Sequence, residues 1–260
     1  MNHVTQGSAS ISEIAPGHWQ LQVTGTADHY SNAQLDDYHH LSRHAFPTYP
    51  PARLSVWAKT PVAHLGTWGF GWWNAPYSPL TSAMPARPAS AWFFGNGKGN
   101  MAWTPQSAAT GFKAATLETR TWKSLLIAPL TPLILLANRV PRLYQWLWSC
   151  LMPHLRLAET MIVMPDNAWH HYVIDWQVDS VTWYIDDISV ARTPFAPHGP
   201  LGLCIWIDNQ WLSATPDGQF GWGLVDAIDT LEIRDITITD LHPDSPSPDG
   251  QGQASHMPPQ

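Results

Sequence analysis

Short segments in which hydrophobic and polar residues alternate recur along most of the chain. Alternation with a period of two residues is typical of β-strands that bury one face. Gly, Pro, Asn and Asp separate these segments, as expected of turns. The segments that we expect to form strands are 19–23, 53–58, 169–176, 181–185, 201–207 and 231–239, the third and fourth as a hairpin. This pattern predicts an all-β sandwich or barrel rather than βαβ units.

One long segment departs from this pattern. Residues 122–159 are rich in Leu and contain no Gly. Pro141 suits the first position of a helix, and Leu143, Leu147 and Leu151 follow it at helical spacing. No acidic residue occurs between Glu118 and Glu159, whereas five of the 13 Lys and Arg residues do. We therefore expect a basic, apolar helical insert at about 120–158.

Composition and charge narrow the class of protein. The chain has 260 residues, of which 44% are hydrophobic, so it can bury a core. Its net charge of −7 argues against nucleic acid as a partner, because phosphate binding needs a basic surface. Neither a secretory signal nor an apolar run of about 20 residues is present, so we expect a cytoplasmic location. We expect one domain over 1–241, and a disordered tail over 242–260, where Pro, Ser, Asp, Gly and Gln prevail.

The predicted hairpin and the strand after it carry a specific pattern. Their sequences read WHHYVIDWQVDSVTWYIDD from residue 169 and GPLGLCIWIDNQW from residue 199. These runs resemble a hairpin and the following strand of glycoside hydrolase family 16, the laminarinase-like enzymes. The resemblance extends over most of 17–240 outside the insert. It implies a concanavalin-like jelly-roll sandwich of two antiparallel sheets with a helical insert.

The catalytic motif of that family is missing from this chain. The family uses a Glu-x-Asp-x-(x)-Glu strand, and a retaining mechanism needs two carboxyl groups about 5–5.5 Å apart. The corresponding strand here is 88–95, PASAWFFG, and no Asp or Glu occurs between Asp37 and Glu118. We therefore expect the family's fold without its hydrolase activity.

Three strands of the family's concave sheet would line a cleft. Alternation along each strand predicts which side chains face it. On this basis the predicted ligand-binding residues are Trp68, Phe70, Trp72, Asn74, Trp92, Phe94, Cys204, Trp206 and Asn209, joined by Trp146 and Trp148 from the insert. Packing in the core between the sheets is the alternative for Trp68 and Phe70.

Few residues near this cleft could act as an acid or a base. Asp208 is the first candidate catalytic group, and Asp36, Asp37 and Tyr38 come after it. The alternatives are a turn-capping role for Asp208 and a solvated loop for the other three. The histidines lack the spacing of a metal site, and no cofactor motif occurs, so we predict neither a metal nor a cofactor.

An aromatic cleft with a few polar groups is typical of small-molecule pockets. We expect it to bind a hydrophobic or amphipathic molecule (lipid, glycolipid, isoprenoid or polyketide), with the insert as a lid. Cyclase or isomerase chemistry is compatible with such a site. The alternative is a carbohydrate-binding jelly roll without catalysis, since sugar faces stack on Trp rings. The basic, apolar insert at 120–158 also predicts contact with a membrane surface through Trp146 and Trp148; packing on the sandwich or dimerisation are its other interpretations.

Overall fold

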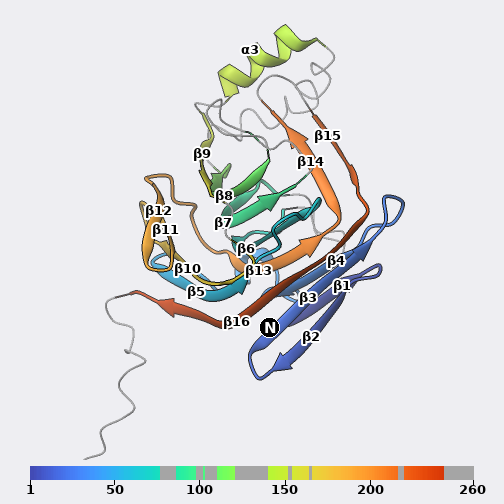
Figure 1. Ribbon diagram of the computed structural model, residues 1–260. Helices are drawn as coiled ribbons and strands as arrows, with labels where there is room; N and C mark the ends of the chain where they lie inside the picture. Colours follow the sequence, from blue (N-terminus) through green and yellow to red (C-terminus); the bar gives the residue numbers. More distant parts are fainter. Residues whose placement is uncertain are drawn as a thin grey trace, which may run out of the picture.

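Two antiparallel seven-stranded sheets form the body of the protein (Figure 1). The computed structural model describes residues 1–76, 86–97, 102, 110–120, 140–151, 154–163, 166–215 and 220–242. The first sheet has the order β1-β4-β13-β6-β7-β8-β9. Its strands are β1 (Asn2–Gln6), β4 (Asn32–Asp36), β13 (Gly202–Asp208), β6 (Thr67–Trp73), β7 (Ala89–Asn96), β8 (Gly111–Glu118) and β9 (Arg156–Ile162). This arrangement is the concanavalin-like sandwich that the sequence predicts.

The second sheet has the order β12-β11-β10-β5-β16-β3-β2. Its strands are β12 (Ile188–Thr193), β11 (Val181–Ile185), β10 (Trp169–Trp176), β5 (Ala52–Lys59), β16 (Ala227–Asp240), β3 (His18–Gly25) and β2 (Ser10–Ala15). A two-stranded sheet of β14 (Gln210–Ala214) and β15 (Phe220–Leu224) and a short 3-10 helix, η1 (Arg43–Ala45), complete the regular elements besides α3 (Pro141–Leu151). The predicted hairpin is β10 and β11, which pair from Tyr172 with Ile185 to Trp176 with Val181.

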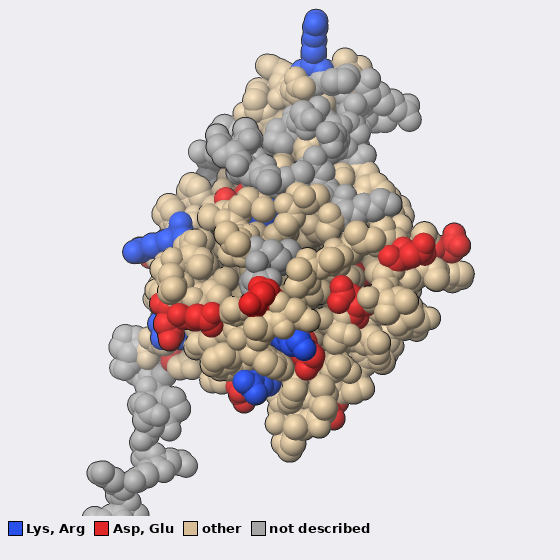
Figure 2. All heavy atoms as spheres, in the orientation of Figure 1, with Lys and Arg blue, Asp and Glu red and all other residues tan. Residues whose placement is uncertain are grey.

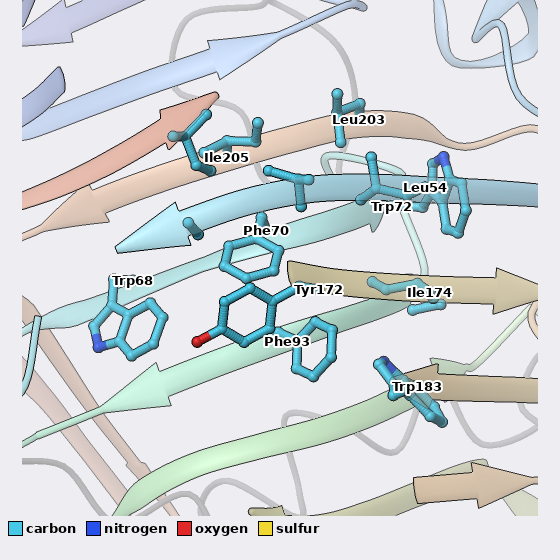
Figure 3. Packing of buried hydrophobic residues seen from close by; sticks show 14 of the residues in the cluster. Leu54, Trp68, Phe70, Trp72, Phe93, Tyr172, Ile174, Trp183, Leu203 and Ile205 are labelled. Carbon is cyan, nitrogen blue, oxygen red and sulfur yellow. The ribbon is translucent and has the colours of Figure 1, made fainter. Parts of the chain in front are cut away.

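Aromatic side chains fill the space between the two sheets. Phe70 and Phe93 of the first sheet lie 5.0 and 5.2 Å, centroid to centroid, from the ring of Tyr172 in the second (Figure 3). All three side chains are fully buried. Strand alternation explains this, because every second residue of β6, β7 and β10 faces the opposite sheet.

The connection between β8 and β9 contains the predicted helical segment. The helix begins at Pro141, as the sequence predicts, and is α3. The sequence analysis missed β9, which pairs antiparallel with β8, so the connection spans 119–155. Residues 121–139 of the predicted insert and 243–260 of the predicted tail lie outside the described residues. Among the helices that the structure describes, none is long and apolar enough to cross a membrane.

Candidate functional site

A pocket of about 230 Å³ opens on the face of the first sheet that points away from the core, which we call the outer face. Side chains of β4, β6, β7 and β13 line it together with the tyrosine before β4. The lining residues are Tyr30, Asn32, Gln34, Trp73, Trp92, Cys204, Trp206 and Asp208. Four of them, Trp92, Cys204, Trp206 and Asp208, are residues that the sequence predicts for the site. The pocket therefore brings together predicted residues from two separate segments of the chain.

Two glycines of β6 make room for the tryptophans beneath the pocket. Gly69 pairs with Trp206, and Gly71 pairs with Trp92. A Cβ atom on Gly69 would lie 2.7 Å from Cη2 of Trp206, and one on Gly71 would lie 2.7 Å from Cβ of Trp92. Gly71 also has a φ of +149°, which side-chain-bearing residues rarely adopt. Gly69 therefore leaves room for the ring of Trp206, and Gly71 allows β7 to approach closely at Ala91 and Trp92.

The tryptophans form a continuous aromatic cluster on the outer face. The rings of Trp73 and Trp92 stack with centroids 4.7 Å apart and planes 26° apart. Trp206 and Phe94 lie 5.4 and 5.7 Å from Trp92, measured between ring centroids. Trp92 and Trp206 are each only 9% exposed. The rings hold one another in place, which presents a preorganised apolar surface to a ligand.

Asp208 is the acidic group of the pocket. Its Oδ1 accepts hydrogen bonds from the backbone N–H and the Oγ1 hydroxyl of Thr67 and from the backbone N–H of Gln210, at 3.1, 2.8 and 3.1 Å. Its Oδ2 accepts a longer bond of 3.4 Å from the Tyr30 hydroxyl. Burial is the main cause that raises the pKa of Asp208, to about 6, and the bonds from Thr67 and Gln210 oppose this rise. Asp208 is therefore poised to change its protonation state near neutral pH.

The sequence analysis missed four residues of the pocket. They are Tyr30, Asn32, Gln34 and Trp73. A signal for two of them was present, because Asn32 and Gln34 alternate along β4 with Ala33 and Leu35, which are buried in the core.

The other predicted acid–base candidates have structural partners. Asp36 is fully buried, and its Oδ1 accepts from the backbone N–H groups of Tyr38 and His39 at 3.1 and 2.8 Å. Asp37 accepts from the backbone N–H of Leu203 at 2.8 Å and lines a different pocket. Tyr38 stacks on Phe46 with centroids 4.7 Å apart. None of the three is among the lining residues of the outer-face pocket, although Tyr38 packs in one cluster with Trp92 and Trp206, and their acid–base role stays a prediction.

Three predicted ligand-binding aromatics face the core instead of the pocket. Trp68, Phe70 and Trp72 are at most 1% exposed and pack between the sheets, as Figure 3 shows. Trp72 contacts Trp176 of β10, with ring centroids 5.1 Å apart. The prediction for these residues is wrong because alternation along β6 turns Gly69, Gly71 and Trp73, rather than the bulky residues between them, toward the outer face.

Asn74 and Asn209 also have structural roles rather than the predicted role in the site. The side-chain amide of Asn74 donates to the backbone carbonyl of Arg87 and accepts from the backbone N–H of Ala89, at 2.8 and 2.9 Å. Asn209 is fully buried and accepts from the backbone N–H of Ser31 at 2.8 Å. Buried amides with such partners fix loops and are unavailable to a ligand.

A buried ion pair lies on the same outer face, next to the aromatic cluster, because Lys113 on β8 is the cross-strand partner of Phe94 on β7. Nζ of Lys113 on β8 lies 3.1 Å from Oε2 of Glu159 on β9, and their side chains are 1% and 2% exposed. Burial lowers the pKa of Lys113, and Glu159 opposes this effect. Most other charged side chains lie scattered over the surface, as Figure 2 shows for one face of the molecule. Lys113 and Glu159 therefore place charge close to the outer-face cluster, which the sequence analysis did not predict.

Trp146 and Trp148 of α3 do not line the pocket. Trp146 is 61% exposed, and Trp148 stacks on Tyr144 within the helix with centroids 5.7 Å apart. Most of the predicted lid lies outside the described residues, so the lid stays a prediction. Among the described residues, no group of three or more His, Cys, Asp or Glu side chains could hold a metal ion.

One part of the chain matches a known protein family. The family model of glycosyl hydrolases family 16 matches residues 157–198, which contain β10, β11 and β12. The chain is 30% identical over 89 residues to Congo red hypersensitive protein 1 of Saccharomyces cerevisiae. That alignment covers 29% of this chain and 17% of the yeast protein.

Several solved structures are similar in fold. An endo-beta-1,4-glucuronan lyase from the fungus Trichoderma reesei is 7% identical, with a TM-score of 0.49 over 92% of this chain and 90% of the lyase. A glycoside hydrolase family 16 endo-glucanase from Bacteroides ovatus is 9% identical, with a TM-score of 0.44 over 89% of this chain and 85% of the enzyme. The Emp47p carbohydrate recognition domain is 10% identical, with a TM-score of 0.44 over 92% of this chain and 88% of the domain. The two antiparallel sheets and the family-model match over 157–198 together indicate a concanavalin-like jelly roll that resembles glycoside hydrolase family 16.

Proposed function

We propose that the outer-face pocket binds a carbohydrate without hydrolysing it. The observation that carries this proposal is the aromatic surface of Trp73, Trp92 and Trp206 with the carboxyl group of Asp208 beside it. A sugar ring has apolar faces that stack on aromatic rings and hydroxyl groups at its edge that need hydrogen-bond partners. A pocket that supplies both kinds of contact suits such a ligand.

The family match supports a carbohydrate ligand, because family 16 acts on glycosidic bonds. The absence of Asp and Glu from β7, the strand that corresponds to the family's catalytic strand, favours binding without the retaining mechanism. Conserving the fold while losing the paired carboxylates would leave the outer face as a recognition surface. Fold alone does not imply activity, so the site rather than the sandwich carries the proposal.

The prediction of a lipid-like ligand gains no support from this pocket. Its volume of about 230 Å³ is below the roughly 300–1,000 Å³ typical of pockets that enclose drug-sized ligands. Four of its eight lining residues have side chains with a hydroxyl, amide or carboxyl group: Tyr30, Asn32, Gln34 and Asp208. A partly open, mixed surface of this kind fits one sugar unit of a chain better than an enclosed apolar molecule.

Affinity electrophoresis in gels that contain soluble polysaccharides tests the proposal. The gels would contain laminarin, mixed-linkage β-glucan, xyloglucan, glucomannan or water-soluble chitosan. We expect retardation in at least one gel, and at least tenfold weaker binding for Trp73→Ala, since an aromatic hot-spot contact contributes about 2 kcal/mol and about 1.4 kcal/mol corresponds to tenfold. Trp222→Ala is the matched control, because Trp222 is 69% exposed and outside the pocket. Unretarded migration in every gel, or equal losses in both variants, would refute the proposal.

A further inference from the structure

The charge of the outer-face pocket has a single sign. Its eight lining residues include the carboxyl group of Asp208 and no Lys, Arg or His. The chain as a whole also carries a net charge of −7. A positively charged ligand therefore meets an anion in the pocket and no cation that would compete with it.

Two acceptor oxygens of the pocket can receive a hydrogen bond from a ligand. Oδ1 of Asp208 receives three hydrogen bonds, whereas Oδ2 receives the single, long bond from Tyr30 among the described residues. Nε2 of Gln34 donates to Asp36 at 2.8 Å, which leaves the carbonyl oxygen of Gln34 for other partners. A donor group of a ligand can therefore be accepted by Oδ2 of Asp208 and by the carbonyl oxygen of Gln34.

Aromatic faces next to a carboxylate favour an ammonium group. A cation over the face of Trp is attracted by the ring's quadrupole, and the attraction grows where water is excluded. Trp206 supplies such a face near Asp208, since Oγ1 of Thr67 is hydrogen-bonded to both side chains, and Trp92 and Trp73 extend the aromatic surface along the pocket. We propose that the pocket prefers a sugar unit with a free ammonium group, so that the ligand is an amino-sugar glycan. This inference rests on the proposed carbohydrate-binding function and names its substrate class.

An ammonium group would also offset the cost of the buried carboxylate. Burial disfavours the ionised form of Asp208, whose pKa is raised to about 6. The ionisable groups around it are Tyr30, Cys204 and His64, and Nε2 of His64 lies 2.6 Å from the backbone carbonyl of Asp208. None of these three groups places a positive charge against Oδ2 in the pocket lining, so a bound ammonium group would be the only cation there. A bound ammonium at Oδ2 would form a charge-assisted hydrogen bond, and these are stronger than neutral ones.

Isothermal titration calorimetry with two matched tetrasaccharides tests this inference at constant pH and salt. The β-1,4-linked tetramer of glucosamine and cellotetraose share one backbone and differ in an amino or a hydroxyl group at each C2 atom. We expect the full-length protein to bind the glucosamine tetramer at least tenfold more tightly. Asp208→Asn should abolish this preference. Asp28→Asn, which removes the same charge from an exposed position, should retain it.

The outcomes separate this inference from the proposed function. Equal or tighter binding of cellotetraose overturns the amino-sugar assignment and leaves carbohydrate binding intact. No binding of either tetramer, together with free migration in all polysaccharide gels, overturns both. An equal loss in Asp28→Asn shows that overall charge, not the pocket, attracts the cation.

A further arm tests the assignment to a sugar. Nα-acetyl-lysine supplies an ammonium group without a sugar, and its binding as tightly as the glucosamine tetramer would overturn the assignment to a sugar. Thermal melting confirms that each variant is folded.

Discussion

Replacing Asp208 with Asn should change how the stability of the protein depends on pH. In the folded chain the pKa of Asp208 is raised to about 6, mainly because the carboxyl group is buried. The unfolded chain keeps the ordinary value of 3.8. Between these two values the folded state binds the proton more tightly than the unfolded state does. The contribution of Asp208 to stability is therefore present at low pH and is lost as the pH rises toward 7.

The size of this effect follows from the two pKa values. Each pKa unit corresponds to 1.36 kcal/mol, so the difference between about 6 and 3.8 corresponds to at most about 3 kcal/mol. Asn cannot ionise, but its side-chain oxygen can still accept from the backbone N–H and the hydroxyl of Thr67. We expect Asp208→Asn to gain up to about 3 kcal/mol in unfolding free energy, relative to the wild type, between about pH 4 and pH 7.

Urea unfolding at a series of pH values measures this difference. Asp37 also has a pKa raised to about 6, mainly by burial, so the wild-type curve contains its contribution as well. That contribution is shared by both proteins and cancels when Asp208→Asn is subtracted from the wild type. Asp28→Asn, which removes a carboxyl group from an exposed position, is the control and should not reproduce the gain of Asp208→Asn. A pH-independent difference for Asp208→Asn would refute the argument that burial governs this carboxyl group.

Three further changes test other parts of the structure. Gly69→Ala would place a Cβ against Trp206, so it should lower stability by about 1–3 kcal/mol in thermal melts and weaken binding in the polysaccharide gels. Gly221→Ala is the control in both assays, because its Cβ would lie 3.4 Å from the nearest atom, Cη2 of Trp211. Lys113→Met should lower the unfolding free energy by about 3–5 kcal/mol, because it removes the cation that pairs with the buried carboxylate of Glu159, and the double variant with Glu159→Met should lose less than the sum of the single variants in urea titrations. If α3 contacts a membrane, Trp146→Ser should reduce sedimentation with phosphatidylserine vesicles at least threefold, whereas Trp222→Ser should not; equal sedimentation of both variants would contradict the contact.

The sequence predicts the sandwich well because its strands alternate over long stretches. In β13, Leu203, Ile205 and Ile207 face the core, and Cys204 and Trp206 face outward, as the pattern requires. The hairpin of β10 and β11 has its predicted bounds, since a four-residue turn separates two strongly hydrophobic strands. The sequence does not predict β9 because only four residues separate it from α3, and its residues, RLAETMI, do not alternate between hydrophobic and polar.

The site is harder to predict because both faces of β6 carry tryptophan. Trp68 and Trp72 face the core, while Trp73, which is adjacent in sequence to Trp72, lines the pocket. Composition cannot distinguish these positions, because an aromatic ring is equally compatible with a core and with a binding surface. The informative residues are the glycines, since Gly69 and Gly71 leave the space that the outward-facing rings need. Which rings those are depends on strand pairing, and pairing is a tertiary property.

The tryptophans of the core and those of the pocket are connected through the backbone of β7. Trp183, in the second sheet, is 1% exposed, and its Nε1 donates a hydrogen bond of 3.2 Å to the backbone carbonyl of Trp92. The side chain of Trp92 lies on the opposite face of β7 and lines the pocket. A buried donor that lost this acceptor would cost about 1–3 kcal/mol, so the core opposes any movement of β7 at this residue. The core tryptophans therefore hold the aromatic surface of the pocket in place, and a ligand meets it already formed.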